Sequence, residues 1–165
     1  MTKGLYAGTF DPLSNGHLDI IKRSLSFCDH LIIGIGDNSA KKTLLPTKTR
    51  LDLINRVLDD VFKQDRARIS VGIFDGLLVN FAKNISANIL IRGIRSVSDF
   101  EYEINLANIN KTLESNIETI FLPTSPDLAV VSSSMIKEII KYNGDISPFV
   151  HPFIRQYLTS MFAQD

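Results

Sequence analysis

Short apolar runs rich in β-branched residues alternate with segments of helical period along most of the chain. The apolar runs cover residues 5–7, 31–35, 69–74, 89–91 and 117–122. Between them, apolar residues recur at helical spacing, as in Leu18, Ile21 and Leu25. Such alternation favours a parallel sheet covered on both faces, with right-handed crossovers. We therefore predict an α/β fold, a doubly wound (Rossmann-like) five-stranded parallel sheet with a C-terminal helix, and we take 3-2-1-4-5 as its strand order.

Several helices can be placed more closely. Helical spacing continues at residues 51–61, 78–85 and 100–107, where Phe100, Ile104 and Ala107 would form a buried face. Thr47 is a reasonable N-cap for the second helix. One serine of residues 132–134 would cap a helix over residues 135–142, with Gly144 as its stop. The final amphipathic segment after Pro152 is predicted to pack as a helix.

Bulk properties exclude several classes of protein. The 165 residues suit a single domain over residues 1–165, and 18 basic residues balance 18 acidic ones. Because the net charge is zero, no overall electrostatic attraction draws the protein to nucleic acid or to an anionic membrane, so we expect neither as a partner. No apolar stretch reaches the length of a membrane span or a signal-peptide core, which predicts a cytoplasmic protein. The single cysteine, Cys28, excludes an internal disulfide and a thiolate metal cluster, and its spacing indicates a core position.

The turn after the first predicted strand reads G-T-F-D-P-L-S-N-G-H over residues 8–17. A helix that begins near Asn15 would leave its first N–H groups unpaired, and these suit an anionic ligand. His17 would lie at this positive end. A protonated histidine is mildly disfavoured there, so a purely structural reason for it is hard to find. The alternative is that His17 is an ordinary first-turn residue.

A second polar loop, residues 92–99, follows the fourth predicted strand and reads R-G-I-R-S at its start. In the predicted strand order, the sheet reverses between strands one and four, and ligands bind beyond the strands at such a point. Arg92 and Arg95 would then bring two guanidinium groups to the proposed phosphate site. The alternative is that they form surface salt bridges with Asp99, Glu101 or Glu103.

Two further loops lie at the same edge of the predicted sheet. Residues 36–45 contain Lys41 and Lys42 and are long enough to fold over a ligand, although lysine pairs are usually solvated. Residues 123–134 bring three serines to a helix start, where capping needs only one. The chain has no P-loop motif, no G-x-G-x-x-G after the first strand, no G-x-S-x-G elbow and no close His/Asp/Glu spacing for a metal cage.

Together these motifs resemble the bacterial phosphopantetheine adenylyltransferases, in the nucleotidyltransferase superfamily with the (H/T)-x-G-H signature. The similar segments are Y-A-G-T-F-D-P-L-S-N-G-H, K-K at 41–42, I-R-G-I-R-S-V-S-D-F-E-Y-E and V-S-S-S-M-I-K-E. The resemblance implies transfer of AMP from ATP to 4′-phosphopantetheine, giving dephospho-coenzyme A and pyrophosphate. Ser14 stands where the family more often has threonine, and Leu128 where it often has an aromatic residue.

The resemblance also implies roles for individual residues. His17, as transition-state stabiliser, Lys41 and Arg92 are the expected catalytic residues. The expected phosphopantetheine-binding residues are Thr9, Lys41, Leu78 and Arg92. The expected ATP-binding residues are Thr9, Phe10, His17, Gly93, Ile94, Arg95, Glu103, Leu128, Ala129, Val130, Val131, Ser132, Ser133 and Ser134.

The expected chemistry is direct in-line attack, because the acceptor phosphate is already a nucleophile and no covalent intermediate is needed. Magnesium is expected on the ATP triphosphate, with its protein ligands unassigned. The family further implies a homohexamer and inhibition by coenzyme A. Two rival functions are a nucleotide-sensing module without turnover and nucleotidyl transfer to a different phosphorylated acceptor.

Overall fold

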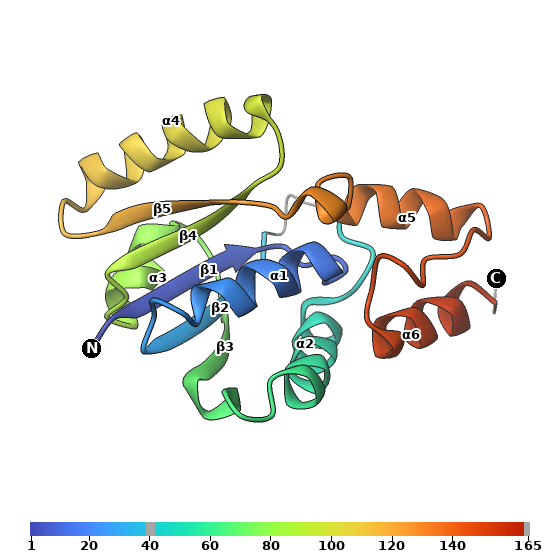
Figure 1. Ribbon diagram of the computed structural model, residues 1–165. Helices are drawn as coiled ribbons and strands as arrows, with labels where there is room; N and C mark the ends of the chain where they lie inside the picture. The colour runs from blue at the N-terminus through green and yellow to red at the C-terminus, as the bar shows by residue number, and fades with distance from the viewer. Residues whose placement is uncertain (39–41, 164–165) are drawn as a thin grey trace.

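The computed structural model describes residues 1–38 and 42–163, and its centre is a parallel sheet (Figure 1). The strands are β1 (Lys3–Gly8), β2 (His30–Gly36), β3 (Ile69–Phe74), β4 (Ile89–Ile94) and β5 (Glu118–Pro123). They pair in the order β3-β2-β1-β4-β5, and every neighbouring pair is parallel. The predicted fold and strand order are therefore confirmed.

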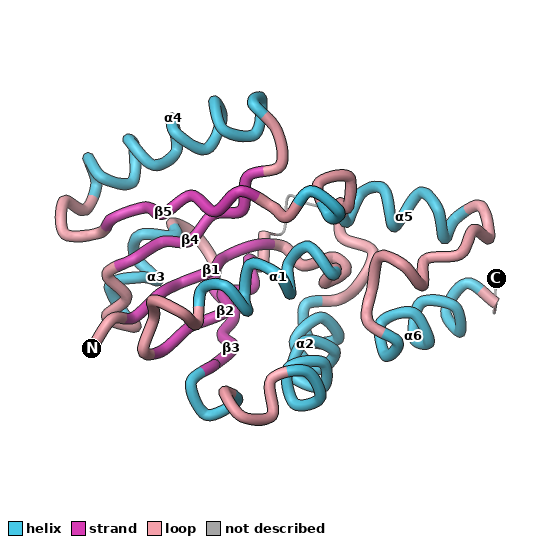
Figure 2. The backbone as a smooth tube through the Cα atoms, viewed as in Figure 1, coloured by secondary structure: helices cyan, strands magenta, loops and turns pink. Residues whose placement is uncertain are grey.

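Helices flank this sheet and continue past its carboxyl edge (Figure 2). They are α1 (Asn15–Ser24), α2 (Thr47–Val61), α3 (Leu78–Asn84), α4 (Val97–Leu113), α5 (Ser133–Lys141) and α6 (Pro152–Phe162). The last of these confirms the predicted C-terminal helix. No helix in the described residues is long and apolar enough to cross a membrane.

Side-chain alternation along the strands divides the core into two parts. Leu5 in β1 packs in one cluster with Val79 of α3, whereas its neighbour Tyr6 packs in the other cluster with Ile20 of α1. Successive strand residues point to opposite faces, so a strand buried on both sides serves both clusters. The larger cluster also joins α2, α5 and α6, and it contains Cys28, which is buried as predicted.

Helix α4 departs from the expected burial. The periodicity of Phe100 and Ile104 predicted a core-facing side, but no residue of α4 is buried, and these two side chains are 41% and 39% exposed. The helix lies beside the edge strand β5, where the ring of Phe100 meets that of Phe121 edge-on, with centroids 5.4 Å apart. β5 is the edge strand of the sheet, so a helix beside it has little sheet surface to pack against. The apolar side of α4 therefore stays largely exposed to solvent.

Two predicted helix boundaries are wrong in detail. Pro46, not Thr47, is the N-cap of α2, and it makes no side-chain capping bond. At the end of α5, Asn143 rather than Gly144 adopts the left-handed conformation, with φ of 57°. Gly144 is needed for another reason: a Cβ there would lie 2.6 Å from Cγ2 of Ile139.

Candidate active site

A cavity of about 390 Å³ opens at the carboxyl ends of β1 and β4, where the strand order reverses. This is the position at which doubly wound sheets bind ligands. Its walls come from the turn after β1, the segment before α2, the end of β4 with the start of α4, and the start of α5. The lining residues are Tyr6, Ala7, Gly8, Thr9, Phe10, Asp11, Ser14, Gly16, His17, Ile20, Lys42, Thr43, Arg92, Gly93, Arg95, Asp99, Glu103, Thr124, Val131, Ser132, Ser133, Ser134 and Lys137.

The turn after β1 is built around a buried aromatic residue in an unusual conformation. Phe10 is 2% exposed and has a φ of 49°, in the left-handed region that bulky residues rarely adopt. Such a residue costs of order 1–3 kcal/mol and persists only where its surroundings hold it. Its ring packs edge-on against His17, with centroids 5.0 Å apart, and against Tyr6 at 5.5 Å. Phe10 thereby packs against the His17 ring and restricts its position.

His17 is the third residue of α1 and closes a capping box with Ser14. The backbone N–H of Ser14 donates to Nδ1 of His17 at 2.9 Å, and the backbone N–H of His17 donates to the Ser14 hydroxyl at 3.4 Å. A glutamate or glutamine usually takes this position. A structural reason for this histidine, which was hard to find from the sequence, therefore exists, because the ring caps the helix.

Burial and a neighbouring charge decide the protonation of His17, and the capping contact decides its tautomer. Burial, followed by the positive charge of Arg95, lowers the pKa of the imidazole from 6.5 to about 4. The ring is therefore neutral near pH 7, which removes the conflict between a cation and the positive helix end. Because Nδ1 accepts a backbone N–H, the ring proton resides on Nε2. The Nε2–H group is then the one hydrogen-bond donor that this ring can offer to a ligand in the cavity.

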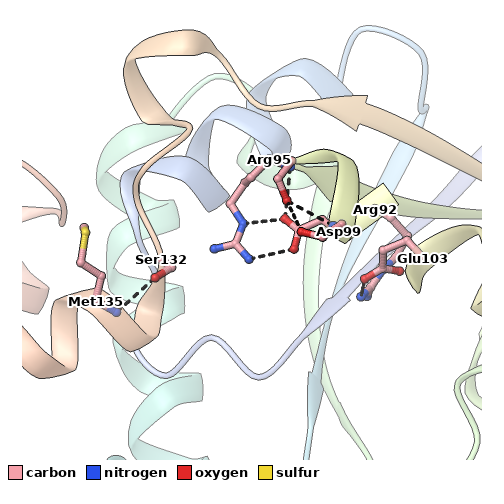
Figure 3. A network of polar contacts seen from close by, with 8 residues as sticks. Arg92, Arg95, Asp99, Glu103, Ser132 and Met135 are labelled. Carbon is pink, nitrogen blue, oxygen red and sulfur yellow. Dashed lines mark hydrogen bonds and ion pairs between the residues drawn. The ribbon is translucent and has the colours of Figure 1, made fainter. Parts of the chain in front are cut away.

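Arg92 and Glu103 form a two-pronged ion pair on the cavity wall (Figure 3). The Nε and Nη2 atoms of Arg92 donate to the two carboxylate oxygens of Glu103 at 2.7 and 2.5 Å. Nη1 donates to the carbonyl oxygen of Ala7 at 2.8 Å, which ties β4 to β1. Burial by itself would lower the pKa of Arg92, but the hydrogen bonds and charge of Glu103 outweigh it and raise that pKa. The guanidinium is thus fixed and charged at the switch point.

Arg95 forms a longer and more exposed ion pair with Asp99, four residues further along the chain. Its Nε donates to Oδ2 of Asp99 at 3.0 Å, and its side chain is 41% exposed (Figure 3). The alternative that both arginines form salt bridges is therefore confirmed for Asp99 and Glu103. Both arginines nevertheless line the cavity, so pairing and a place at the site coexist.

The three serines at the start of α5 have different neighbours. Ser132 is the N-cap and accepts the backbone N–H of Met135 at 3.1 Å (Figure 3). The Ser133 hydroxyl donates to the carbonyl oxygen of Pro12 at 2.8 Å and so ties α5 to the turn after β1. Ser134 is exposed, and all three line the cavity. As expected, one serine suffices for capping.

Not every predicted site residue reaches the cavity wall. Lys41 lies outside the described residues, although the adjacent Lys42 and Thr43 line the cavity. Leu78 begins α3 and packs against the small core cluster on the opposite face of the sheet. Ile94 at the end of β4, and Leu128, Ala129 and Val130 before α5, also lie outside the lining set. Substrate contacts by these residues stay predictions.

Sequence reasoning missed two charged residues that the structure brings together. Asp11 is 2% exposed and accepts the backbone N–H groups of Leu44 and Leu45, each at 2.8 Å. Lys137 of α5 donates to the same carboxylate at 3.2 Å. An acidic residue inside a predicted phosphate loop was the available signal, because such a carboxylate needs a cation or several N–H donors nearby.

Acidic groups at the site are engaged by protein donors. Asp11 is held by two N–H groups and Lys137, Asp99 by Arg95, and Glu103 by Arg92. Across residues 1–38 and 42–163, no group of three histidine, cysteine or acidic side chains could hold a metal ion. Those described residues therefore do not form a dedicated metal cage.

Comparisons with known proteins show the family of the chain and support its fold. Residues 5–139 match the model of the family described as cytidylyltransferase-like. The chain is 42% identical over 161 residues to the phosphopantetheine adenylyltransferase of Parvibaculum lavamentivorans, covering 98% of this chain and 95% of the relative. It is 47% identical over 154 residues to that of Vesicomyosocius okutanii, covering 93% and 94%. The nicotinic acid mononucleotide adenylyltransferase of Plasmodium falciparum is 15% identical and superposes with a TM-score of 0.69 over 99% of both chains, which supports the fold.

Proposed function

The chain belongs to the phosphopantetheine adenylyltransferases, within the cytidylyltransferase-like family, and from this premise we propose that it transfers AMP from ATP to 4′-phosphopantetheine in the cytoplasm. The observation that carries the proposal is a neutral His17 at a helix N-terminus, on one cavity wall with Arg92 and Arg95. These groups supply fixed positive charge and a fixed donor where charge develops during phosphoryl chemistry.

The reaction is a single in-line displacement. A phosphate oxygen of 4′-phosphopantetheine forms a bond to the α-phosphorus of ATP. The bond from that phosphorus to the oxygen that bridges the α- and β-phosphates breaks. The products are dephospho-coenzyme A and pyrophosphate, which takes the electron pair of the broken bond. The acceptor is already an anion, so positioning and charge stabilisation suffice.

Each side chain has a proposed task in this displacement. The Nε2–H of His17 donates to the α-phosphoryl oxygens as their charge rises. Thr9 orients the acceptor, and Arg92 with Lys41 holds its phosphate. Glu103, besides its proposed contact with ATP, holds the Arg92 guanidinium in place.

The leaving group is held on the other side of the cavity. Arg95 and the serines at positions 132–134 contact the pyrophosphate, next to the N–H groups that begin α5. Magnesium bound to the triphosphate would neutralise part of its negative charge. This is consistent with described cavity carboxylates that are already paired with protein donors, and with the tendency of magnesium to keep its water ligands.

One assay separates the proposed reaction from its rivals. The protein is incubated with ATP, magnesium and a panel of acceptors: 4′-phosphopantetheine, pantetheine without the phosphate, and nicotinamide mononucleotide. Pyrophosphate released only with 4′-phosphopantetheine supports the proposal. Release only with another acceptor refutes the substrate, and no release with any acceptor indicates a nucleotide sensor.

We also propose a homohexamer that coenzyme A inhibits. Helix α4 leaves several large apolar side chains exposed, among them Tyr102, Ile109 and Leu113 at 64%, 54% and 53%, and contact between subunits would cover them. Coenzyme A contains the product's skeleton and would compete for the same cavity. Light scattering after size exclusion measures the assembly, and initial rates at rising coenzyme A measure inhibition.

A further inference from the structure

Arg50 of α2 is a fully charged side chain in the protein interior, with the residue only 2% exposed. Its guanidinium collects three backbone carbonyl oxygens: Nη1 donates to Thr9 at 2.7 Å and to Gly36 at 3.2 Å, and Nε donates to Leu45 at 3.1 Å. Nη2 donates to the hydroxyl of Thr47 at 2.6 Å. Four hydrogen bonds thus hold one buried cation.

No carboxylate within the described part of the chain lies at ion-pair distance from Arg50. A buried charge without a counterion is costly, and carbonyl dipoles only partly compensate for it. A neutral side chain would avoid the cost but could not reach three separate carbonyl groups. The site therefore favours a residue with several donors in a fixed plane.

Of the three carbonyl groups, one belongs to a residue that lines the cavity and one lies two residues after the lining residue Thr43. Thr9 lines the cavity directly, Gly36 ends β2, and Leu45 precedes α2. From the other side, the Asp11 carboxylate binds the N–H groups of Leu44 and Leu45. The backbone next to Lys42 and Thr43 is thereby held at both its N–H and its C=O groups.

We propose that Arg50 is a positioning residue of the active site, which fixes the Thr9 turn relative to the segment that carries Lys42 and Thr43. Arg50 does not itself line the cavity, so it acts through these neighbours. The inference rests on the proposed function, in which this side of the cavity binds the acceptor phosphate. Loss of Arg50 would then weaken use of 4′-phosphopantetheine more than use of ATP.

The chain contains a matched control for this role. Arg68 also collects three carbonyl oxygens, from Leu25 at 2.6 Å, Cys28 at 2.6 Å and Asp29 at 3.3 Å. These contacts precede β2 and β3, at the amino edge of the sheet and opposite the cavity. Arg68 differs from Arg50 in also donating to Asp65 at 2.7 Å and in being partly exposed. Substituting it removes the same kind of carbonyl contact without touching the site.

The experiment compares Arg50→Lys with Arg68→Lys in the full chain. Lysine keeps the charge but concentrates its donors on one nitrogen, so it cannot hold all three carbonyl groups. We expect Arg50→Lys to lower kcat/KM for 4′-phosphopantetheine about tenfold or more, with the KM for ATP changed by less than about twofold. Calorimetry without ATP should show a matching loss of 4′-phosphopantetheine affinity. Arg68→Lys should change neither quantity by more than about twofold while lowering the thermal midpoint.

Equal kinetic parameters and acceptor affinity in the two folded variants would overturn the proposal, as would equal losses for both substrates in Arg50→Lys. If Arg50→Lys does not fold, Thr47→Val replaces it, because it removes one acceptor from the guanidinium. It also removes the 2.6 Å hydrogen bond from Thr47 to Asp37, so Asp37→Ala, which removes that bond but not the one to Arg50, is its control. The same acceptor-selective loss at smaller size is expected in Thr47→Val and not in Asp37→Ala. An unchanged acceptor affinity in Thr47→Val would then overturn the proposal. Failure of the proposed function appears separately, as wild-type protein that neither binds nor adenylylates 4′-phosphopantetheine.

Discussion

His17 should stay neutral, with its proton on Nε2, throughout the range in which an ordinary histidine titrates. Its pKa is lowered from 6.5 to about 4 by burial and by Arg95, and its Nδ1 accepts the Ser14 N–H at 2.9 Å. Each unit of pKa is worth 1.36 kcal/mol, so the lowering corresponds to at most about 3 kcal/mol of folding free energy. The residue is only half-buried, and water in the cavity reduces that figure.

The sign of the stability effect follows from linkage. Between pH 6.5 and 4 the unfolded chain binds a proton at His17 that the folded chain does not, so this part of the stability is present above pH 6.5 and is lost as the pH falls through about 4. His17→Gln keeps a capping-box residue but cannot titrate. On going from pH 7 to pH 4, wild type should therefore lose up to about 3 kcal/mol more unfolding free energy than His17→Gln.

Two assays check this. Nitrogen-detected NMR of the imidazole rings gives the pKa and tautomer of His17. Urea unfolding at fixed protein concentration, from pH 7 to pH 4, gives the stability of wild type and His17→Gln. A His17 pKa near 6.5, a proton on Nδ1, or parallel pH profiles of the two proteins would refute the reasoning.

Three further substitutions test the site and the fold. His17→Ala should lower kcat about a hundredfold or more with little change in ATP affinity, because the lost donor acts on the transition state, and an unchanged kcat would remove its catalytic role. Arg92→Ala should raise the KM for 4′-phosphopantetheine more than that for ATP, whereas equal increases would contradict its assignment to the acceptor phosphate. Gly144→Ala should lower the unfolding free energy by about 1–3 kcal/mol in urea titrations, because its Cβ would lie 2.6 Å from Cγ2 of Ile139, and an unchanged value would show that Ile139 can move aside.

Much of the site could be located from the sequence because its residues follow strands directly. The turn at residues 8–17 and the arginines after residue 91 come at strand ends, and parallel strands bring such ends to one edge. Asp11 and Lys137 escaped notice because they are 126 residues apart, and neither position indicates a partner by local spacing. Leu78 begins α3 and packs against the smaller core cluster, outside the residues that line the cavity, and its contact with the substrate stays a prediction.

Local pattern by itself determined the fold class and most element positions, whereas the strand order was assumed and then found in the structure. The period of apolar residues reports which backbone geometry can bury them, and crossover handedness then leaves few topologies. Only the tertiary structure decided the exposure of α4, the pairing of Arg92 with Glu103, and the capping role and neutral state of His17. Each of these depends on burial and on the positions of donors in three dimensions, and neither quantity is encoded in the spacing of residues along the chain.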